Sequence, residues 1–132
     1  VLPVAVLAET IRGGATIKPL WQPGPDPEPH YQPSAKLAAF VRARDMFCRF
    51  PGCDVPADRC DVDHVVPHAD GGPTSVGNLQ ALCRHHHRAK TFGGYAVTMT
   101  PEGVCNWESP TGRRWTTLPS GETIATTLAP AS

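Results

Sequence analysis

CRFPGC at residues 48–53 and CRHHH at residues 83–87 are the stretches that decide the fold. In the first, the thiols of Cys48 and Cys53 lie five positions apart across a Pro-Gly turn. In the second, Cys83 precedes three histidines. A tetrahedral zinc ion takes four nitrogen or sulfur ligands, commonly as two close pairs from separate segments. We therefore predict a structural zinc site formed by Cys48, Cys53, Cys83 and one of the histidines.

The spacing alone leaves the fourth ligand open. We expect residues 79–90 to form a helix, in which each residue is rotated by about 100° from the one before. On that helix His86 lies about 60° to one side of Cys83 and His87 about 40° to the other, so either can share its face. His85 points about 160° away from Cys83, and we expect it in solvent.

The stretch DVDHVVP, residues 61–67, carries a second chemical signal. As a short strand that ends at Pro67, it places Val62, His64 and Val66 on one face and Asp61, Asp63 and Val65 on the other. An adjacent carboxylate and imidazole supply a ligand for a hard metal ion beside a candidate general base. Because Gly71-Gly72, Asn78-Leu79 and the cysteine-histidine segment follow, we interpret Asp63 and His64 as chemical groups rather than a structural pair.

Composition narrows the class of protein. The chain has 132 residues, enough for one domain, and its fifteen prolines and twelve glycines exclude a long helical bundle. Twelve basic and twelve acidic residues cancel, so any contact with nucleic acid must come from a local patch. No apolar run approaches the roughly 20 residues that span a bilayer. An odd number of cysteines, five, without a signal peptide disfavours disulfides, so we expect a cytoplasmic protein. We expect Cys105 in the core, and Cys60 either buried or competing for zinc.

Chain breakers divide the sequence into five expected parts. Residues 1–21, with a helix over Val4–Ile11, belong to a preceding part of a larger protein, and residues 22–33, with five prolines, form a linker. Residues 34–94 form the core, which begins with a helix over Ser34–Asp45 capped by Ser34. Strands at residues 95–100, 104–108 and 113–118 form a β extension, and residues 119–132 are a frayed tail.

Taken in order, these motifs resemble a known family. They are Cys48…Cys53, Asp63-His64-x-x-Pro67, Gly71-Gly72, Asn78-Leu79 and Leu82-Cys83-x-x-His86-His87-x-x-Lys90. The pattern resembles the HNH endonuclease domain, a ββα-metal nuclease, with its three signature letters on His64, Asn78 and His87. The flanks, Arg44-Asp45-x-x-Cys48 and Trp107-x-Ser-Pro-x-Gly112, look like the C-terminal HNH portion of actinobacterial repeat proteins of unknown function. The chain departs from the family's two Cys-x-x-Cys pairs in its longer first spacing and in His86.

The resemblance implies a fold and two metal ions. The fold is α+β: a small zinc-stabilised ββα-metal domain with an N-terminal helix, a Pro-rich linker and a C-terminal β-hairpin extension. His86 is assigned to the structural zinc with Cys48, Cys53 and Cys83. His87 is assigned with Asp63 to a catalytic divalent ion, Mg²⁺, Mn²⁺ or another.

The resemblance also implies a function, endonucleolytic hydrolysis of DNA with His64 as the general base. Asn78 either orients His64 through its loop or supplies a carbonyl ligand. We expect phosphate contacts from basic side chains, namely Arg49, Arg84, Arg88 and Lys90, with Arg113 and Arg114 as further candidates. The alternative is a catalytically silent, zinc-stabilised nucleic-acid-binding or interaction module, which the zero net charge favours. No membrane partner is expected.

Overall fold

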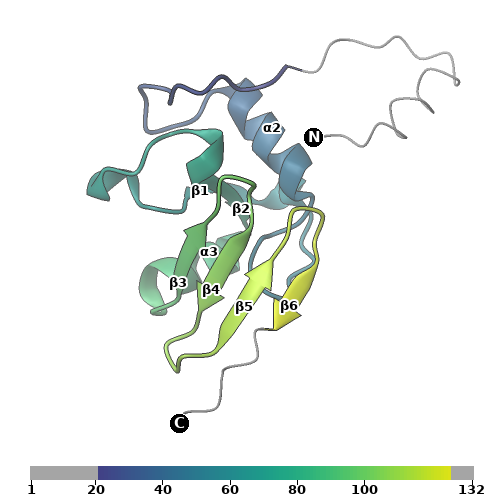
Figure 1. The fold of residues 1–132 in the computed structure, drawn as a ribbon. Coiled ribbons are helices and arrows are strands. Elements are labelled where there is room, and N and C mark those ends of the chain that lie inside the picture. The colour runs from purple at the N-terminus through teal and green to yellow at the C-terminus, as the bar shows by residue number, and fades with distance from the viewer. Residues whose placement is uncertain (1–20, 126–132) are drawn as a thin grey trace, which may run out of the picture.

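The computed structural model describes residues 21–125, so the expected helix over Val4–Ile11 lies outside the described residues. The described part is α+β, with two α-helices, a two-stranded sheet and a four-stranded sheet (Figure 1). The elements are α2 (Ala35–Asp45), β1 (Asp61–His64), β2 (Leu79–Leu82), α3 (Arg84–Phe92), β3 (Ala96–Met99), β4 (Cys105–Glu108), β5 (Arg114–Thr117) and β6 (Thr123–Ala125). None of the helices described is long and apolar enough to cross a membrane.

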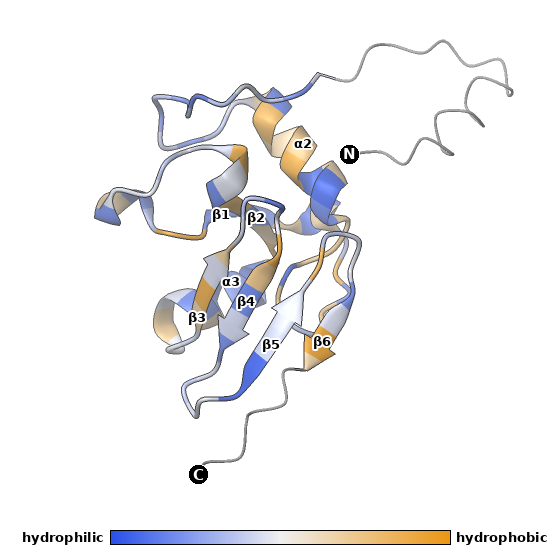
Figure 2. Cartoon of the chain, viewed as in Figure 1, coloured by the Kyte–Doolittle hydropathy of each residue, from blue (hydrophilic) through white to orange (hydrophobic). Residues whose placement is uncertain are grey.

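Helix α2 confirms the prediction for residues 34–45. The Ser34 hydroxyl accepts a hydrogen bond from the Leu37 amide at 3.2 Å, which satisfies one of the free donors at the helix start. The first turns of α2 are coloured as hydrophobic in Figure 2 and the last turn as hydrophilic. Its buried residues Leu37 and Val41 pack against Leu79 of β2, and each such buried side chain contributes roughly 1.5–3 kcal/mol to folding.

Strand β2 corrects the helix expected over residues 79–90. Leu79–Leu82 is a strand, antiparallel to β1 with Asp61 opposite Leu82 and His64 opposite Leu79. All four residues of β2 are buried, and a stretch this short has no periodicity that separates strand from helix. Pairing with β1 decides the outcome. Cys83 has an extended backbone and is the N-cap of α3, which begins only at Arg84.

The C-terminal sheet contains one more strand than expected. Strands β3, β4 and β5 confirm the three predicted strands, and they pair in sequence order as an antiparallel meander. The expectation of a frayed tail from residue 119 was wrong for Thr123–Ala125, which pairs with β5 as β6. A tight turn makes this possible, because Ser120 and Gly121 adopt φ of 82° and 99° and the Leu118 amide reaches the Glu122 carbonyl at 2.9 Å.

A buried ion pair joins α2 to both sheets. The Arg49 guanidinium donates to Asp45 Oδ1 at 2.8 Å and to the carbonyls of Gly103 and Thr117 at 2.6 and 2.7 Å. Asp45 Oδ2 in turn accepts from the Ala81 amide of β2 at 2.8 Å. These groups are buried and paired with one another, although Arg49 Nε has no partner among the described residues. Removal of Arg49 leaves the two carbonyls without this donor, while Asp45 keeps its ion pair with Arg44 at 2.7 Å.

Candidate metal centres and active site

A Cys3His cluster lies where the 48–53 loop meets the start of α3. Its members are Cys48, Cys53, Cys83 and His86, whose ligand atoms all lie within 4.8 Å of one another. His86 Nδ1 lies 3.6 Å from the Cys48 sulfur and 3.3 Å from the Cys83 sulfur. In a tetrahedral zinc site with Zn–S of about 2.3 Å and Zn–N of about 2.0 Å, sulfur and nitrogen are about 3.5 Å apart. The cluster could therefore hold a structural zinc.

The structure resolves the choice between the neighbouring histidines. The His86 ring stacks on Phe50, with centroids 3.9 Å apart and planes within 5°, and this contact turns Nδ1 toward the two sulfurs. His85 is exposed, as expected. Burial raises the pKa of the Cys48 thiol well above its ordinary range, so formation of a thiolate there needs a cation nearby.

The two other cysteines lie outside this cluster. The Cys60 thiol is buried and donates to the Pro56 carbonyl at 3.4 Å. Cys105 is fully buried and its thiol faces Gln80 Oε1 at 3.5 Å, which confirms the expected core position. Burial raises the pKa of each to about 11, so both stay protonated at neutral pH.

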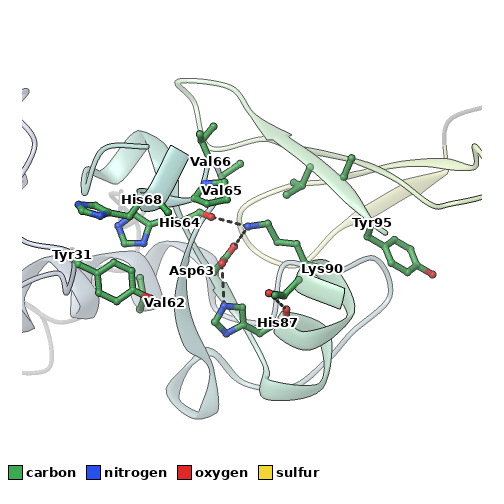
Figure 3. Close-up of a pocket in the computed structure, with 15 residues that line it drawn as sticks. Tyr31, Val62, Asp63, His64, Val65, Val66, His68, His87, Lys90 and Tyr95 are labelled. Carbon is green, nitrogen blue, oxygen red and sulfur yellow. Dashed lines mark hydrogen bonds and ion pairs between the residues drawn. The ribbon is translucent and has the colours of Figure 1, made fainter. Parts of the chain in front are cut away.

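A second cluster connects β1 to α3. Asp63 Oδ1 lies 3.2 Å from His87 Nε2, and Figure 3 shows these two side chains pointing toward one another. Two adjacent ligands of an octahedral ion with metal–ligand distances of about 2.1 Å are about 3.0 Å apart, so this pair fits one small divalent ion. On the other side of the ring, His87 Nδ1 donates to Asp61 Oδ2 at 3.0 Å.

Asp61 is a site residue that the sequence analysis did not single out. Its hydrogen bond holds Nδ1 and turns Nε2 toward Asp63, so a metal ion bound by Nε2 would have the carboxylate–histidine arrangement that is typical of metal-binding histidines. A signal was present in the sequence, because strand alternation places Asp61 and Asp63 on the same face.

The second oxygen of Asp63 is held by two donors. Gln80 Nε2 of β2 donates to Asp63 Oδ2 at 2.9 Å, and Lys90 Nζ donates to it at 2.8 Å. The same ammonium donates to the His64 carbonyl oxygen at 2.7 Å. Lys90, which we expected to contact flanking phosphates, thus lies inside the site. Gln80 is a further site residue that the sequence did not reveal, because residues 79–90 were expected to be helical.

His64 projects from β1 to the opposite side from Asp63, toward Tyr31 and His68 (Figure 3). Its Nε2 lies 2.9 Å from the Thr74 hydroxyl. Burial lowers the pKa of His64, and the nearby His68 lowers it further. The neutral form required of a general base is therefore favoured at neutral pH.

Asn78 closes the loop that follows β1. Its Oδ1 accepts from the Val66 amide at 2.9 Å, while its Nδ2 donates to the carbonyls of Val66 and Pro73 at 3.0 and 2.9 Å. Gly72 packs so closely here that a Cβ would overlap the Val66 carbonyl. Because both ends of the amide are engaged, the geometry favours the loop-orienting role over the carbonyl-ligand role.

The predicted DNA-contacting cations lie in different surroundings. Arg49 is 1% exposed, and both terminal nitrogens of its guanidinium donate to Asp45 or to buried carbonyls, so the expectation that it contacts phosphates was wrong. Arg84 is exposed on α3 and pairs with Asp61 at 3.0 Å. Arg88 and Arg113 are exposed, and Arg114 lies 3.7 Å from Glu108.

The candidate catalytic residues Asp63, His64 and His87 line one pocket of about 630 Å³ (Figure 3), and Asn78 lies outside its lining. Its walls come from β1 and the loop after it, from α3, from the start of β3 and from Tyr31. The lining residues are Tyr31, Val62, Asp63, His64, Val65, Val66, Pro67, His68, Ala69, His87, Lys90, Thr91, Tyr95, Ala96 and Val97. A pocket of this size beside the Asp63–His87 pair can admit a phosphodiester and a water molecule.

Comparisons with known proteins identify the family of the segment that holds both clusters. Residues 47–93 match the model of the family described as HNH endonuclease. Uncharacterized protein Rv3776 of Mycobacterium tuberculosis is 49% identical over 99% of this chain, and uncharacterized protein Rv2100 of the same organism is 54% identical over 90% of it. The chain spans about a quarter of the length of these relatives, 27% and 22%. No solved structure matches. Residues 47–93, which hold the Cys3His cluster and the Asp63–His87 pair, are an HNH endonuclease domain.

Proposed function

We propose that this domain hydrolyses phosphodiester bonds in DNA, with His64 as the general base and one divalent cation held by Asp63 and His87. The observation that carries the proposal is the 3.2 Å approach of Asp63 Oδ1 to His87 Nε2 within the pocket that His64 also lines. Hydrolysis requires an activated water and a positive charge beside the phosphate, and these three residues supply the groups for both.

The cation site is supported by the residues around its two ligands. Asp61 orients the ring of His87, and Gln80 holds the carboxylate of Asp63. When bound, Mg²⁺, Mn²⁺ or another divalent ion would neutralise charge that develops on the phosphate oxygens and the leaving oxygen.

The base is His64, which accepts the proton of the attacking water. Burial lowers its pKa, so its neutral form is present at neutral pH without a neighbouring activator. Asn78 contributes indirectly, because it closes the loop that follows His64.

Phosphate contacts come from basic side chains of α3. Arg84 and Arg88 are exposed there, and the Lys90 ammonium lies at the pocket wall, where it can approach the phosphate beside Asp63. The structural zinc we propose for Cys48, Cys53, Cys83 and His86 ties the 48–53 loop to the start of this helix. The zinc would thus hold α3 and its basic side chains in position without taking part in the chemistry.

A plasmid-nicking assay with Mg²⁺ or Mn²⁺ tests the proposal. The wild type should convert supercoiled DNA to nicked and linear forms, and His64→Ala should not. His30→Ala is a matched control, since His30 is an exposed histidine outside both clusters. Cleavage by His64→Ala at the wild-type rate would refute the assignment of the base.

One observation favours a second function, a nucleic-acid-binding module without cleavage. The Lys90 ammonium lies 2.8 Å from Asp63 Oδ2, so it already neutralises part of the charge that would attract a metal ion. In that case DNA binds in a salt-dependent manner, and no divalent ion produces nicking.

A further inference from the structure

The segment before α2 folds back onto the active-site loop. We refer to residues 28–34 as the strap. Its first residue, Glu28, pairs with Thr74 as a β-bridge, with the Glu28 amide donating to the Thr74 carbonyl at 2.8 Å. The Glu28 carboxylate accepts hydrogen bonds from the Ser34 amide and hydroxyl, both at 2.7 Å, which closes the strap at its other end. The strap precedes the family-matched segment, and its residues 28–33 were expected to be part of a linker.

The strap places Tyr31 against the candidate general base. The rings of Tyr31 and His64 stack with centroids 5.2 Å apart and planes within 14°. Tyr31 also meets His68 edge to face at 5.4 Å. Tyr31 is 66% exposed whereas His64 is 6% exposed, so the tyrosine supplies a wall for the imidazole while its own outer surface stays open. A stacked wall restricts rotation of the imidazole about its side-chain torsions.

Thr74 connects the same two residues through its hydroxyl. The hydroxyl donates to the Tyr31 carbonyl at 3.4 Å, and it lies 2.9 Å from His64 Nε2. A hydroxyl has a single proton, so when that proton is directed at the Tyr31 carbonyl the oxygen accepts from His64 Nε2–H. In this arrangement His64 Nδ1 carries the lone pair that can take a proton from water.

We infer that Tyr31 and Thr74 are positioning residues for His64, so that the strap completes an active site whose chemical groups all lie in residues 47–93. Tyr31 sets the orientation of the imidazole and Thr74 sets its tautomer. The inference rests on the proposed function, because it assumes that His64 is the base. It goes beyond that function in assigning a role to a segment outside the family motif.

Kinetics of paired variants provide the first test. Tyr31→Ala should lower kcat for nicking by about 10²-fold, the effect of an ångström-scale misplacement of a reacting group, with little change in KM. Tyr31→Phe should retain most of the activity, because the ring makes the contact. Thr74→Val should also lower kcat, and Thr74→Ser should restore it. His30→Ala, on the same strap, should behave as the wild type.

Nitrogen NMR of His64 in the zinc-loaded protein provides a second test that does not depend on cleavage. We expect the Nε2–H tautomer in the wild type and in Tyr31→Phe, and a mixture of tautomers in Thr74→Val and Tyr31→Ala. If the wild type fails to nick DNA but shows this pattern, the positioning of His64 stands and the proposed nuclease activity falls. A wild-type Nδ1–H tautomer would overturn the inference. A Tyr31→Ala variant that cleaves as fast as the wild type or faster would also overturn it. Faster cleavage would mean that Tyr31 blocks access to His64 and does not position it.

Discussion

The carboxylate of Asp61 should control the affinity of the catalytic centre for its divalent ion. Asp61 Oδ2 accepts a hydrogen bond from His87 Nδ1 at 3.0 Å, on the side of the ring opposite Asp63, so it orients the nitrogen that faces the metal site. Loss of such a partner typically weakens metal binding by about 10- to 100-fold, or about 1.4–2.8 kcal/mol. Asp61→Ala should therefore raise the Mn²⁺ concentration for half-maximal nicking by about 10- to 100-fold. Asp61→Asn, whose amide oxygen can still accept a hydrogen bond from His87 Nδ1, should fall at the lower end of that range.

The assay is a titration of nicking rate against Mn²⁺ for each variant, with zinc content and melting temperature measured on the same preparations. At saturating Mn²⁺ the maximal rate of Asp61→Ala should approach that of the wild type, because Asp63 and His64 are intact. Arg84→Ala is the control for the Mn²⁺ midpoint, which it should leave unchanged even though Arg84 is also a proposed phosphate contact. It removes the other partner of Asp61, a surface ion pair whose arginine side chain is 72% exposed and contributes little. An unchanged Mn²⁺ midpoint in an active Asp61→Ala would refute the view that Asp61 orients a metal-binding His87.

Three further predictions concern the zinc, the base and the cations. Cys83→Ser should lose the zinc and melt at a lower temperature than the wild type. Zinc binding to the wild type should release protons, because burial raises the pKa of the Cys48 thiol. A wild-type melt that a chelator does not change, with no zinc in elemental analysis, would contradict both. His64→Ala should keep its fold and zinc but cleave about 10²- to 10⁴-fold more slowly. Burial lowers the pKa of His64, and only the neutral imidazole accepts a proton, so the wild-type cleavage rate should rise with pH and reach its plateau by neutral pH. A cleavage rate that falls over this pH range would rule out an imidazole base. Arg49→Ala should destabilise the domain by about 3 kcal/mol in denaturant titrations, because the buried Asp45 keeps only Arg44 as a cation and the Gly103 and Thr117 carbonyls lose this donor. Arg88→Ala should leave stability unchanged and reduce the salt dependence of DNA binding by the equivalent of about one phosphate contact. The opposite pattern for these two arginines would place Arg49 at the DNA.

The sequence by itself determined the ligand chemistry and the elements with strong local signals. The two cysteine-containing stretches predicted the Cys3His cluster because thiols and an imidazole in close pairs from two segments are characteristic of structural zinc sites. The helix begins at the Ser34 cap and the three expected strands of the C-terminal sheet formed, since capping and strand alternation are properties of neighbouring residues.

Tertiary structure alone decided which groups meet across the fold. Leu79–Leu82 became a strand because β1 was available to pair with it, and that pairing brought Gln80 to Asp63. Arg49 has the sequence surroundings of a surface cation, yet it is buried because Asp45 and two distant carbonyls satisfy its donors. Tyr31 reached His64 through a bridge between Glu28 and Thr74, residues 46 positions apart in the chain. Ligand type and helix capping depend on near neighbours in the sequence, so the local pattern predicted the metal ligands. Burial and strand pairing depend on contacts between residues distant in the sequence, so only the folded chain shows which groups surround those ligands.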